Sequence, residues 1–266
     1  MEKAQLSVER KMVSNKVFAD RHVLVTGGSS GIGRAAALAF AGQGAASVTV
    51  TGRRREPLEE VAALHPVVVP VVADVATDAG ATAVAESIKA RSGMIDVIVH
   101  NAGVFRRTPL ADMELEAVRE LLDVNVFGPV LLTGRLSPLL RSPGGNIVVV
   151  SSINGRVASA GVSVYSATKA AVDSLVASWA VELAPRGIRV NGVAPGTVLT
   201  PILAAGGVPS TDAEEWRADY ARTSPAGRIG RVEDVVPWIT RLAEPVSSWV
   251  TGEVIVVDGG KTLVGL

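Results

Sequence analysis

The chain contains no cysteine and only three histidines. The absence of cysteine excludes disulfides, thiolate nucleophiles and cysteine-based metal sites, and it suits a reducing compartment. The histidines, His22, His65 and His100, are too few and too scattered along the sequence to suggest a ligand cluster. We therefore expect no metal site.

Charge and hydrophobicity are not concentrated in any one stretch. Acidic and basic residues balance at 26 each, so no net field attracts nucleic acid or an anionic membrane surface. Glycine, proline or charged residues interrupt every apolar run well short of the roughly 20 residues that a membrane-spanning helix needs. Residues 1–21 also lack the pattern of a signal peptide. We expect a soluble, cytoplasmic protein whose partner is a small molecule, not nucleic acid or a membrane.

Short β-branched runs alternate with longer helix-like stretches along the chain. The predicted strands are residues 22–25, 47–51, 67–72, 96–99, 146–151, 189–193 and 253–257. The predicted helices are residues 32–41, 57–64, 81–91, 114–140, 163–183 and 232–243. Alternation this regular predicts an α/β fold with a doubly wound, seven-stranded parallel sheet, helices on both faces and ligands bound at the carboxyl ends of the strands.

No linker or change in composition divides the chain, so we predict a single domain over residues 18–266. The polar stretch before it, residues 1–17, is expected to be a poorly ordered extension. Residues 200–224 combine a Gly-Gly and Pro loop with a short amphipathic piece. An insertion of this kind after a late strand predicts a lid over the substrate.

The first predicted strand leads directly into a glycine-rich loop, residues 26–33, which opens a helical pattern. Gly27, Gly31 and Gly33 let the backbone turn sharply and approach a pyrophosphate, whose charge is met by free N–H groups and the helix dipole. An ordinary glycine-rich turn is the alternative, but the order of strand, loop and helix favours a dinucleotide site.

The end of the second predicted strand indicates which dinucleotide is bound. An acidic residue here usually binds the ribose 2′-hydroxyl of NAD, whereas arginine accommodates the 2′-phosphate of NADP. The chain has Arg53 and Arg54, and no acid appears before Glu56. NADP(H) is therefore favoured and NAD(H) remains possible, because the arginines could simply solvate the start of a helix.

Tyr165 and Lys169 are four residues apart in a helical pattern, which places the phenol and the ammonium on one helix face. A free tyrosine titrates near pH 10, and a neighbouring cation favours the phenolate. We expect Lys169 to lower the pKa of Tyr165 towards the range of a general acid and base. Taken alone, the pair could equally be a surface contact.

Two further polar residues accompany this pair. Ser152 stands at the end of the fifth predicted strand, where its hydroxyl can donate to a substrate oxygen. Asn125 stands inside the long helix predicted over residues 114–140, where asparagine is unfavourable, and a kink there would let it hold a water.

Together with the glycine loop and the Tyr165–Lys169 pair, Ser152 and Asn125 resemble the short-chain dehydrogenase/reductase family, and the resemblance extends from residue 18 to the C-terminus. The matching motifs are Thr26 to Gly33, Asp74, Asn101-Ala102-Gly103, Asn125, Ser152, Tyr165, Lys169, Pro195-Gly196, Thr200, Thr251-Gly252 and Asp258-Gly259-Gly260.

The resemblance implies a Rossmann fold, an NAD(P)-dependent oxidoreductase interconverting a ketone or aldehyde with an alcohol, and a catalytic tetrad of Asn125, Ser152, Tyr165 and Lys169. The implied cofactor contacts are Gly27, Ser29, Ser30, Gly31, Ile32, Gly33, Arg53, Arg54, Asp74, Val75, Asn101, Ala102, Gly103, Tyr165, Lys169, Pro195, Gly196 and Thr200. Two departures are visible. His100 replaces the usual first asparagine and is interpreted as a packing residue, and Ser30 stands where NADP-preferring relatives carry a basic residue.

The substrate is less well defined. We expect it to contact Ser152, Asn154, Val162 and Tyr165, with further candidates Ile153, Val104, Phe105, Ile202, Leu203, Trp216 and Tyr220. Most of these side chains are apolar, which favours a hydrophobic or mixed ketone or alcohol over a phosphorylated sugar. The alternatives are a catalytically silent dinucleotide-binding scaffold and an isomerase or dehydratase. The resemblance also implies a homo-oligomer, a tetramer or dimer, in which Trp238 and Trp249 lie in the interface or in the core.

Overall fold

The computed structural model describes residues 16–264, so the predicted extension lies almost entirely outside the described residues. Seven parallel strands form one sheet in the order β3-β2-β1-β4-β5-β6-β7. The strands are β1 (His22–Thr26), β2 (Ser47–Gly52), β3 (Val68–Val72), β4 (Val97–His100), β5 (Asn146–Val150), β6 (Arg189–Pro195) and β7 (Val254–Val257). Each lies within two residues of its predicted range, and the predicted doubly wound fold is confirmed.

The strands are rich in valine and isoleucine because both faces of the sheet are buried. In β1, Leu24 packs into one apolar cluster and Val25 into the other. In β4, Ile98 and Val99 alternate in the same way. A one-residue shift in register would exchange the two faces, so this alternation fixes the alignment of each strand.

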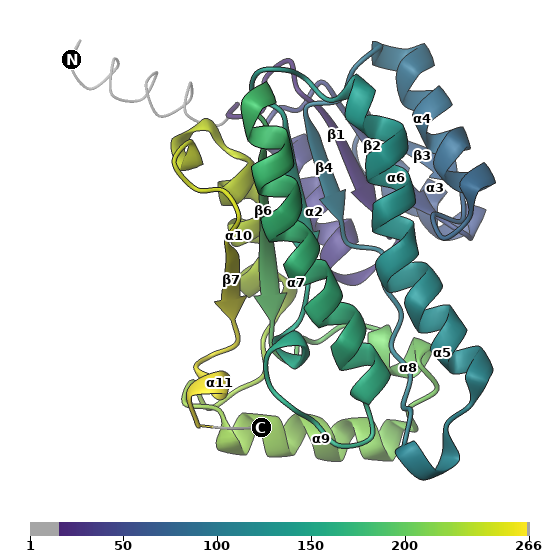
Figure 1. Ribbon diagram of the computed structural model, residues 1–266, viewed down its shortest axis with the longest axis vertical. Coiled ribbons are helices and arrows are strands. Elements are labelled where there is room, and N and C mark those ends of the chain that lie inside the picture. Colours follow the sequence, from purple (N-terminus) through teal and green to yellow (C-terminus); the bar gives the residue numbers. More distant parts are fainter. Residues whose placement is uncertain (1–15, 265–266) are drawn as a thin grey trace.

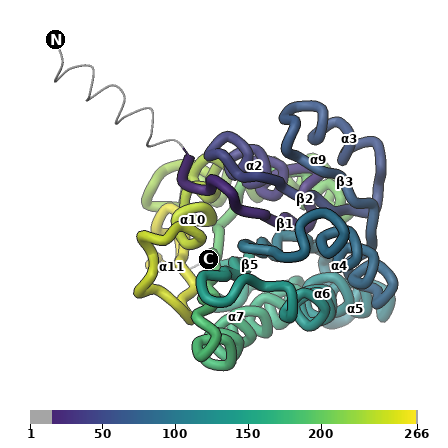
Figure 2. The backbone as a smooth tube through the Cα atoms, turned by 90° about the horizontal axis from the view of Figure 1, so that it is seen from above, coloured from purple at the N-terminus to yellow at the C-terminus, as the bar shows by residue number. Residues whose placement is uncertain are grey.

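Helices cover both faces of the sheet, giving three layers (Figure 2). One face is covered by α2 (Gly31–Gly42), α3 (Arg55–Ala62) and α10 (Val232–Ala243), and the other by α4 (Asp78–Ser92), α6 (Gly128–Leu136) and α7 (Ser163–Leu183). The short α5 (Leu115–Leu122) precedes α6, and α11 (Lys261–Val264) follows β7.

The strand order reverses between β1 and β4, which are neighbours in the sheet although β2 and β3 separate them in the chain. Ligands of doubly wound sheets bind outside the carboxyl ends of the strands at such a switch point. The helices α8 (Ile202–Ala205) and α9 (Ser210–Thr223) lie across this end of the molecule (Figure 1). The segment predicted to be a lid, residues 200–224, therefore lies at the end of the sheet where such ligands bind.

The segment predicted as one helix over residues 114–140 is interrupted, and that prediction was wrong. A π-helical turn, Asp123–Phe127, separates α5 from α6. Pro129 has no N–H to donate to the carbonyl of Asn125 four residues earlier. The Gly128 N–H instead donates five residues back, to the Asp123 carbonyl. The widened turn places Asn125 at the kink that its sequence context suggested.

The described part of the chain begins with a well-packed segment. Phe18 is buried and meets the Phe40 ring edge-on at 4.7 Å. By contrast, Trp249 is 99% exposed and Trp238 is 43% exposed, so neither is a core residue of this chain. Between residues 16 and 264, no helix has both the length and the hydrophobicity needed to cross a bilayer.

Candidate active site

The glycine loop is held in place from β4. The Asn101 side-chain amide donates to the carbonyls of Thr26 and Gly27, at 2.9 and 3.2 Å. The Thr26 hydroxyl accepts the N–H groups of Asn101 and Ala102, at 3.0 and 2.9 Å. Thr26 therefore joins the two loops at the switch point. Its position in the loop motif was visible in the sequence, but its role depends on a strand far away in the chain.

Glycine is required at positions 27 and 33 of the loop for different structural reasons. Gly27 has φ +64°, and a Cβ there would lie 2.8 Å from the Ala102 backbone. A Cβ on Gly33 would overlap the Asn101 amide nitrogen and the Gly27 carbonyl oxygen. Gly33 does not line the cavity, so its expected cofactor contact is corrected to a packing role, in which it lets α2 lie close to the loop.

A long cavity runs along the carboxyl ends of the strands. Its walls include nearly all residues expected to bind a cofactor, namely Gly27, Ser29, Ser30, Gly31, Ile32, Arg53, Arg54, Asp74, Val75, Asn101, Ala102, Gly103, Tyr165, Lys169, Pro195, Gly196 and Thr200. The N-cap residue of α2, Ser30, makes no side-chain hydrogen bond to the first helical turn. The helix end therefore presents its N–H groups and its positive dipole to the cavity, as a pyrophosphate requires.

At the end of β2, the cavity is lined by arginines and by no carboxylate. Arg53 and Arg54 are exposed on the wall, and neither forms an ion pair within residues 16–264. Asp74 is held in a tight turn by the Ala76 N–H at 3.1 Å. These residues fit a dinucleotide. The two arginines can also bind an additional negatively charged group.

Tyr165 and Lys169 lie one turn apart on the buried face of α7. The Lys169 ammonium donates to the Val150 carbonyl at 3.0 Å and lies 5.7 Å from the centre of the Tyr165 ring. Burial raises the pKa of Tyr165 to about 12, and hydrogen bonding with Ser152 opposes that rise. Burial also lowers the pKa of Lys169 to about 8, while Asp173 acts to raise it. The expected lowering of the Tyr165 pKa by Lys169 is not found, because burial of the phenol favours its neutral form and only the Ser152 hydrogen bond opposes this.

Asn125 is used differently from the other three tetrad residues. Its side-chain oxygen accepts the Val104 N–H at 2.8 Å, and its amide donates to the Val104 carbonyl at 3.0 Å and to Thr168 Oγ1 at 3.1 Å. Asn125 does not line the cavity. It joins the loop after β4 to α7, and it lies beside Gly103, which separates it from Lys169.

The wall nearest Tyr165 is mainly aromatic and aliphatic. The Phe105 ring lies 5.1 Å from Tyr165 and 5.8 Å from Trp216 of α9, both edge-on. Ser152 and Asn154 also line this part of the cavity, and the Ser152 hydroxyl accepts the Asn154 N–H at 3.2 Å. The other side chains here are Val104, Arg106, Val124, Ile202 and Leu203.

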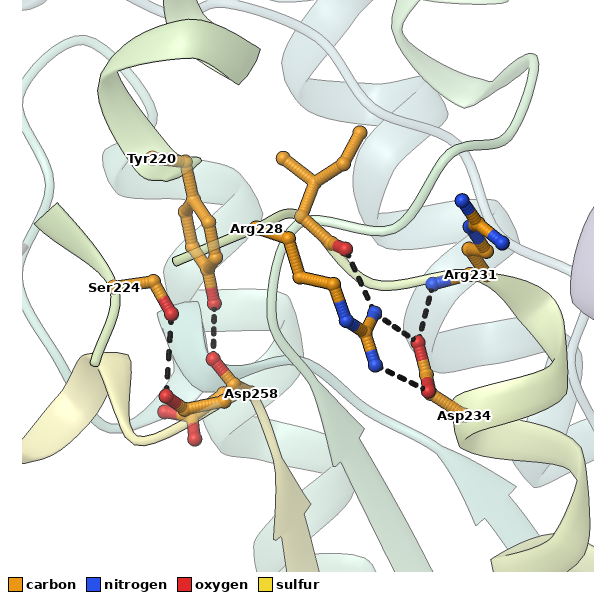
Figure 3. A network of polar contacts seen from close by, with 8 residues as sticks. Tyr220, Ser224, Arg228, Arg231, Asp234 and Asp258 are labelled. Carbon is orange, nitrogen blue, oxygen red and sulfur yellow. Dashed lines mark hydrogen bonds and ion pairs between the residues drawn. The ribbon is translucent and has the colours of Figure 1, made fainter. Parts of the chain in front are cut away.

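Three residues expected near the substrate do not line the cavity. Val162 is buried in the apolar cluster with Phe105 and Tyr165, so its expected substrate contact is corrected to a supporting one. Ile153 is buried behind Ser152. Tyr220 points towards the C-terminal turn rather than the cavity, and its hydroxyl donates to the Asp258 carbonyl at 2.8 Å (Figure 3).

The C-terminal end of the lid is anchored by polar contacts. Ser224 donates to the Gly259 carbonyl, next to the Tyr220–Asp258 contact (Figure 3). A Cβ on Gly196, which lines the cavity, would overlap the Tyr220 hydroxyl. The glycine of the Pro195-Gly196 pair is therefore required because the lid packs directly against it.

His100 is a structural residue, as interpreted from the sequence. Its side chain is buried, burial lowers its pKa to about 4, and its Nε2 lies 2.8 Å from the Thr133 hydroxyl. It is therefore neutral at physiological pH and it holds α6 to the sheet.

Comparisons with known proteins assign this arrangement to a family. A family model described as enoyl-(acyl carrier protein) reductase matches residues 27–262. The chain belongs to the short-chain dehydrogenase/reductase family. As a member, it is an NAD(P)-dependent oxidoreductase that acts on the CH–OH group of alcohols or on the corresponding carbonyl.

This short-chain dehydrogenase has relatives with different substrates. It is 40% identical over 256 residues to a cis-4-hydroxycyclohexanecarboxylate dehydrogenase from Sinomonas cyclohexanicum, covering 94% of this chain and 99% of the relative. A glucose 1-dehydrogenase from Gluconobacter oxydans is 39% identical over 256 residues, covering 93% and 94%. A solved short-chain dehydrogenase/reductase of unknown function from Caenorhabditis elegans, determined with cofactor, has a TM-score of 0.87 at 36% identity, covering 93% of this chain and 97% of the other.

Proposed function

We propose that this oxidoreductase reduces a ketone or aldehyde, or oxidises the matching alcohol, with Tyr165 as general acid and base. The observation that carries the proposal is the meeting of Tyr165, Ser152 and Lys169 in one cavity beside a dinucleotide cradle. The nicotinamide, when bound, supplies or accepts the hydride. A protonated Tyr165 donates to the substrate oxygen in reduction, and the Ser152 hydroxyl stabilises that oxygen.

Lys169 and Asn125 assist this proton transfer without donating the proton themselves. When a cofactor is bound, the Lys169 ammonium, which donates to the Val150 carbonyl beside Tyr165, would hold its ribose hydroxyls. Asn125 fixes the loop that carries Gly103 and Val104. Because Pro129 cannot donate to the Asn125 carbonyl, the π-helical turn offers a place for a water that links Lys169 to solvent. With this machinery assembled, a purely scaffolding protein is the weaker alternative.

NADP(H) is the proposed coenzyme. Arg53 and Arg54 line the adenosine end, and both are exposed with no ion pair among the described residues. A 2′-phosphate would gain charge-assisted hydrogen bonds from them. Because Ser30 adds no second basic group on the loop, NAD(H) binding is expected to be weaker but measurable.

The proposed substrate is hydrophobic near its reacting carbon, because Phe105, Trp216, Ile202 and Leu203 surround Tyr165. A panel of ring and chain alcohols and ketones, scored by cofactor absorbance with both coenzymes, tests the reaction, its direction and the coenzyme together. If no compound in the panel changes the absorbance with either coenzyme, the proposed function is wrong.

We also propose a homo-oligomer, a tetramer or dimer. Apolar side chains are exposed along the outer faces of α5 to α7 and near the C-terminal strand, namely Leu115, Leu122, Phe127, Val130, Val181, Trp238, Val246 and Trp249. Burying these side chains against a second copy would remove apolar surface from water. Sedimentation velocity gives the assembly state. The cytoplasmic location stays a prediction.

A further inference from the structure

One cation in the substrate half of the cavity is not used by the proposed chemistry. Of the charged side chains that line the cavity, Arg53, Arg54 and Asp74 lie at the ends of β2 and β3. Lys169 and Arg106 lie at the other end, Lys169 beside Tyr165 and Arg106 against α8. Since Lys169 is part of the proposed machinery, Arg106 is the charged group that remains to be explained.

Arg106 lines the same cavity as Tyr165. It follows Phe105, whose ring lies 5.1 Å from the Tyr165 ring. Its Nη1 donates to the carbonyls of Phe105 and Ala205, at 3.0 and 2.9 Å, and these bonds hold the guanidinium against the end of α8. The side chain of Arg106 is 29% exposed. The guanidinium is thus fixed in position at the cavity wall instead of extending into solvent.

The remaining nitrogens of Arg106 are only partly used. Nη2 forms an ion pair with Glu120 Oε2 at 2.8 Å, and among residues 16–264 Nε has no hydrogen-bond partner. An arginine has five N–H donors, so donors remain for a further acceptor. Glu120 itself does not line the cavity, and no acidic side chain lines the cavity near Arg106.

We infer that Arg106 binds a carboxylate of the substrate, so that the substrate class is a hydroxy acid or oxo acid with a hydrophobic body between its two polar ends. The inference rests on the proposed function, because it places the carbonyl or carbinol end at Tyr165. The carboxylate end then lies at Arg106, and the body packs against Phe105 and Trp216.

The chemistry of the wall favours a carboxylate over other groups. A planar guanidinium fits a carboxylate by parallel charge-assisted hydrogen bonds. A neutral sugar would leave the Arg106 guanidinium without an anionic partner and would place its hydroxyls against the Phe105 and Trp216 rings. Apart from Lys169, which the proposed chemistry already uses, a phosphate dianion would meet only Arg106 at this end, and Arg106 is already paired with Glu120.

Glu120 supplies an internal test, since it competes with the substrate for the same guanidinium. Replacing it by Gln keeps the size of the side chain and removes the competing charge. Glu120→Gln should therefore tighten the binding of a carboxylate and leave a neutral ligand unaffected. If Arg106 only latches the lid, loss of the Glu120 ion pair would weaken both ligands alike.

The first measurement is binding without turnover. Calorimetry on the full chain saturated with coenzyme compares cyclohexanecarboxylate with the uncharged, similarly shaped cyclohexanecarboxamide. We expect the carboxylate to bind at least about ten-fold tighter in the wild type, since a charged hydrogen bond is lost with the amide. That preference should vanish in Arg106→Gln, persist in part in Arg106→Lys, and increase in Glu120→Gln.

The second measurement is the ratio of kcat/KM for 4-hydroxycyclohexanecarboxylate to that for its carboxamide, in each variant. A ratio within one variant cancels any general loosening of the lid. Arg107→Gln is the matched control, because Arg107 pairs with Asp212 at 3.4 Å on the lid but does not line the cavity. It should leave the ratio unchanged.

The outcomes separate the two proposals. The carboxylate site is wrong if neutral alcohols are oxidised and the carboxylate binds no more tightly than the carboxamide. It is also wrong if Arg106→Gln lowers the affinity for both ligands equally. In either case the proposed oxidoreductase activity stands. If the carboxylate binds through Arg106 but no alcohol or ketone reacts with either coenzyme, the site stands as a binding site and the proposed function fails.

Discussion

The ammonium nitrogen of Lys169 lies 5.7 Å from the centre of the Tyr165 ring, one turn further along the same face of α7. Both groups are buried, so burial favours the neutral form of each. The phenol is therefore held as a proton donor, and the lysine, with a pKa lowered to about 8, stays mainly a cation at neutral pH.

Tyr165→Phe should remove nearly all turnover because the substrate oxygen loses its proton donor. The change removes one hydroxyl and keeps the ring that packs against Phe105. Cofactor binding, measured by the fluorescence of NADPH, should stay within about two-fold of wild type, since no charge is removed. Substantial activity in this variant would contradict the role of Tyr165.

Asp173→Asn should shift the pH dependence of ketone reduction. Asp173 acts to raise the pKa of Lys169, which burial lowers to about 8, and one Asp173 oxygen has no hydrogen-bond partner among the described residues. Loss of the carboxylate lets the pKa of Lys169 fall further. If the cation is required, activity should be lost at a lower pH than in wild type as the pH rises. Asp219→Asn, in the surface pair with Arg222, is the control. It should not change the pH at which activity is lost.

Arg53→Ala should weaken NADPH binding by about 1.5–3 kcal/mol, the usual value of a hydrogen bond to a charged group. NADH has no 2′-phosphate, so its affinity should hardly change. Arg55→Ala is the control, because Arg55 pairs with Glu59 at 3.4 Å and does not line the cavity. Titration of both coenzymes into each variant decides the matter, and tighter NADH than NADPH binding in the wild type would reverse the proposed preference.

Gly33→Ala should destabilise the fold by about 1–3 kcal/mol, because the added methyl overlaps the Asn101 amide and the Gly27 carbonyl. Gly42→Ala is a matched control in the same helix, where nothing lies within 4 Å of the added methyl. That control should be neutral or slightly stabilising. Urea unfolding of the two variants compares them directly, and equal stabilities would exclude the packing role of Gly33.

Asp96→Asn should destabilise the amino ends of the strands. The Asp96 side chain is 1% exposed and pairs with Arg21 and Arg141. Burial acts to raise its pKa, but the hydrogen bonds from Arg141, the His22 N–H and Arg21 outweigh burial, so the pKa lies below 3.8. Stability from the carboxylate is thus complete above about pH 4 and is lost as the pH falls through the folded-state pKa.

We expect Asp96→Asn to lower the free energy of unfolding by about 3 kcal/mol near neutral pH, since the arginines lose a buried partner. The difference from wild type should shrink as the pH falls below about 4. Urea unfolding at several pH values measures both effects. Asp78→Asn, in the exposed pair with Arg135, should change stability by less than about 0.5 kcal/mol.

Sequence patterns predicted what depends on neighbours along the chain. The alternation of strands and helices follows from local hydrophobic periodicity, and Tyr165 and Lys169 share a face because four residues make about one helical turn. The Gly27 loop was recognisable for the same reason, since its strand, turn and helix are consecutive. These features survive almost unchanged in the fold.

Other features were hidden because they depend on which distant segments meet. The π-helical turn at Asn125 follows from Pro129, a local cause, yet the contact of Asn125 with Val104 requires the β4 loop to approach α7. Gly33 and Val162 resemble site residues in the sequence, but packing places both behind the cavity wall.

The sequence by itself determined the fold and the NAD(P)-dependent reaction class, and it suggested the proposed tetrad, because each follows from short, contiguous spacings. Only the tertiary structure decided that the pKa of Tyr165 is raised and not lowered, since burial of the ring depends on all the segments that pack around it. It likewise decided that Arg106 lines the cavity while its neighbour Arg107 does not, because that difference depends on where α8 and α9 lie against the loop.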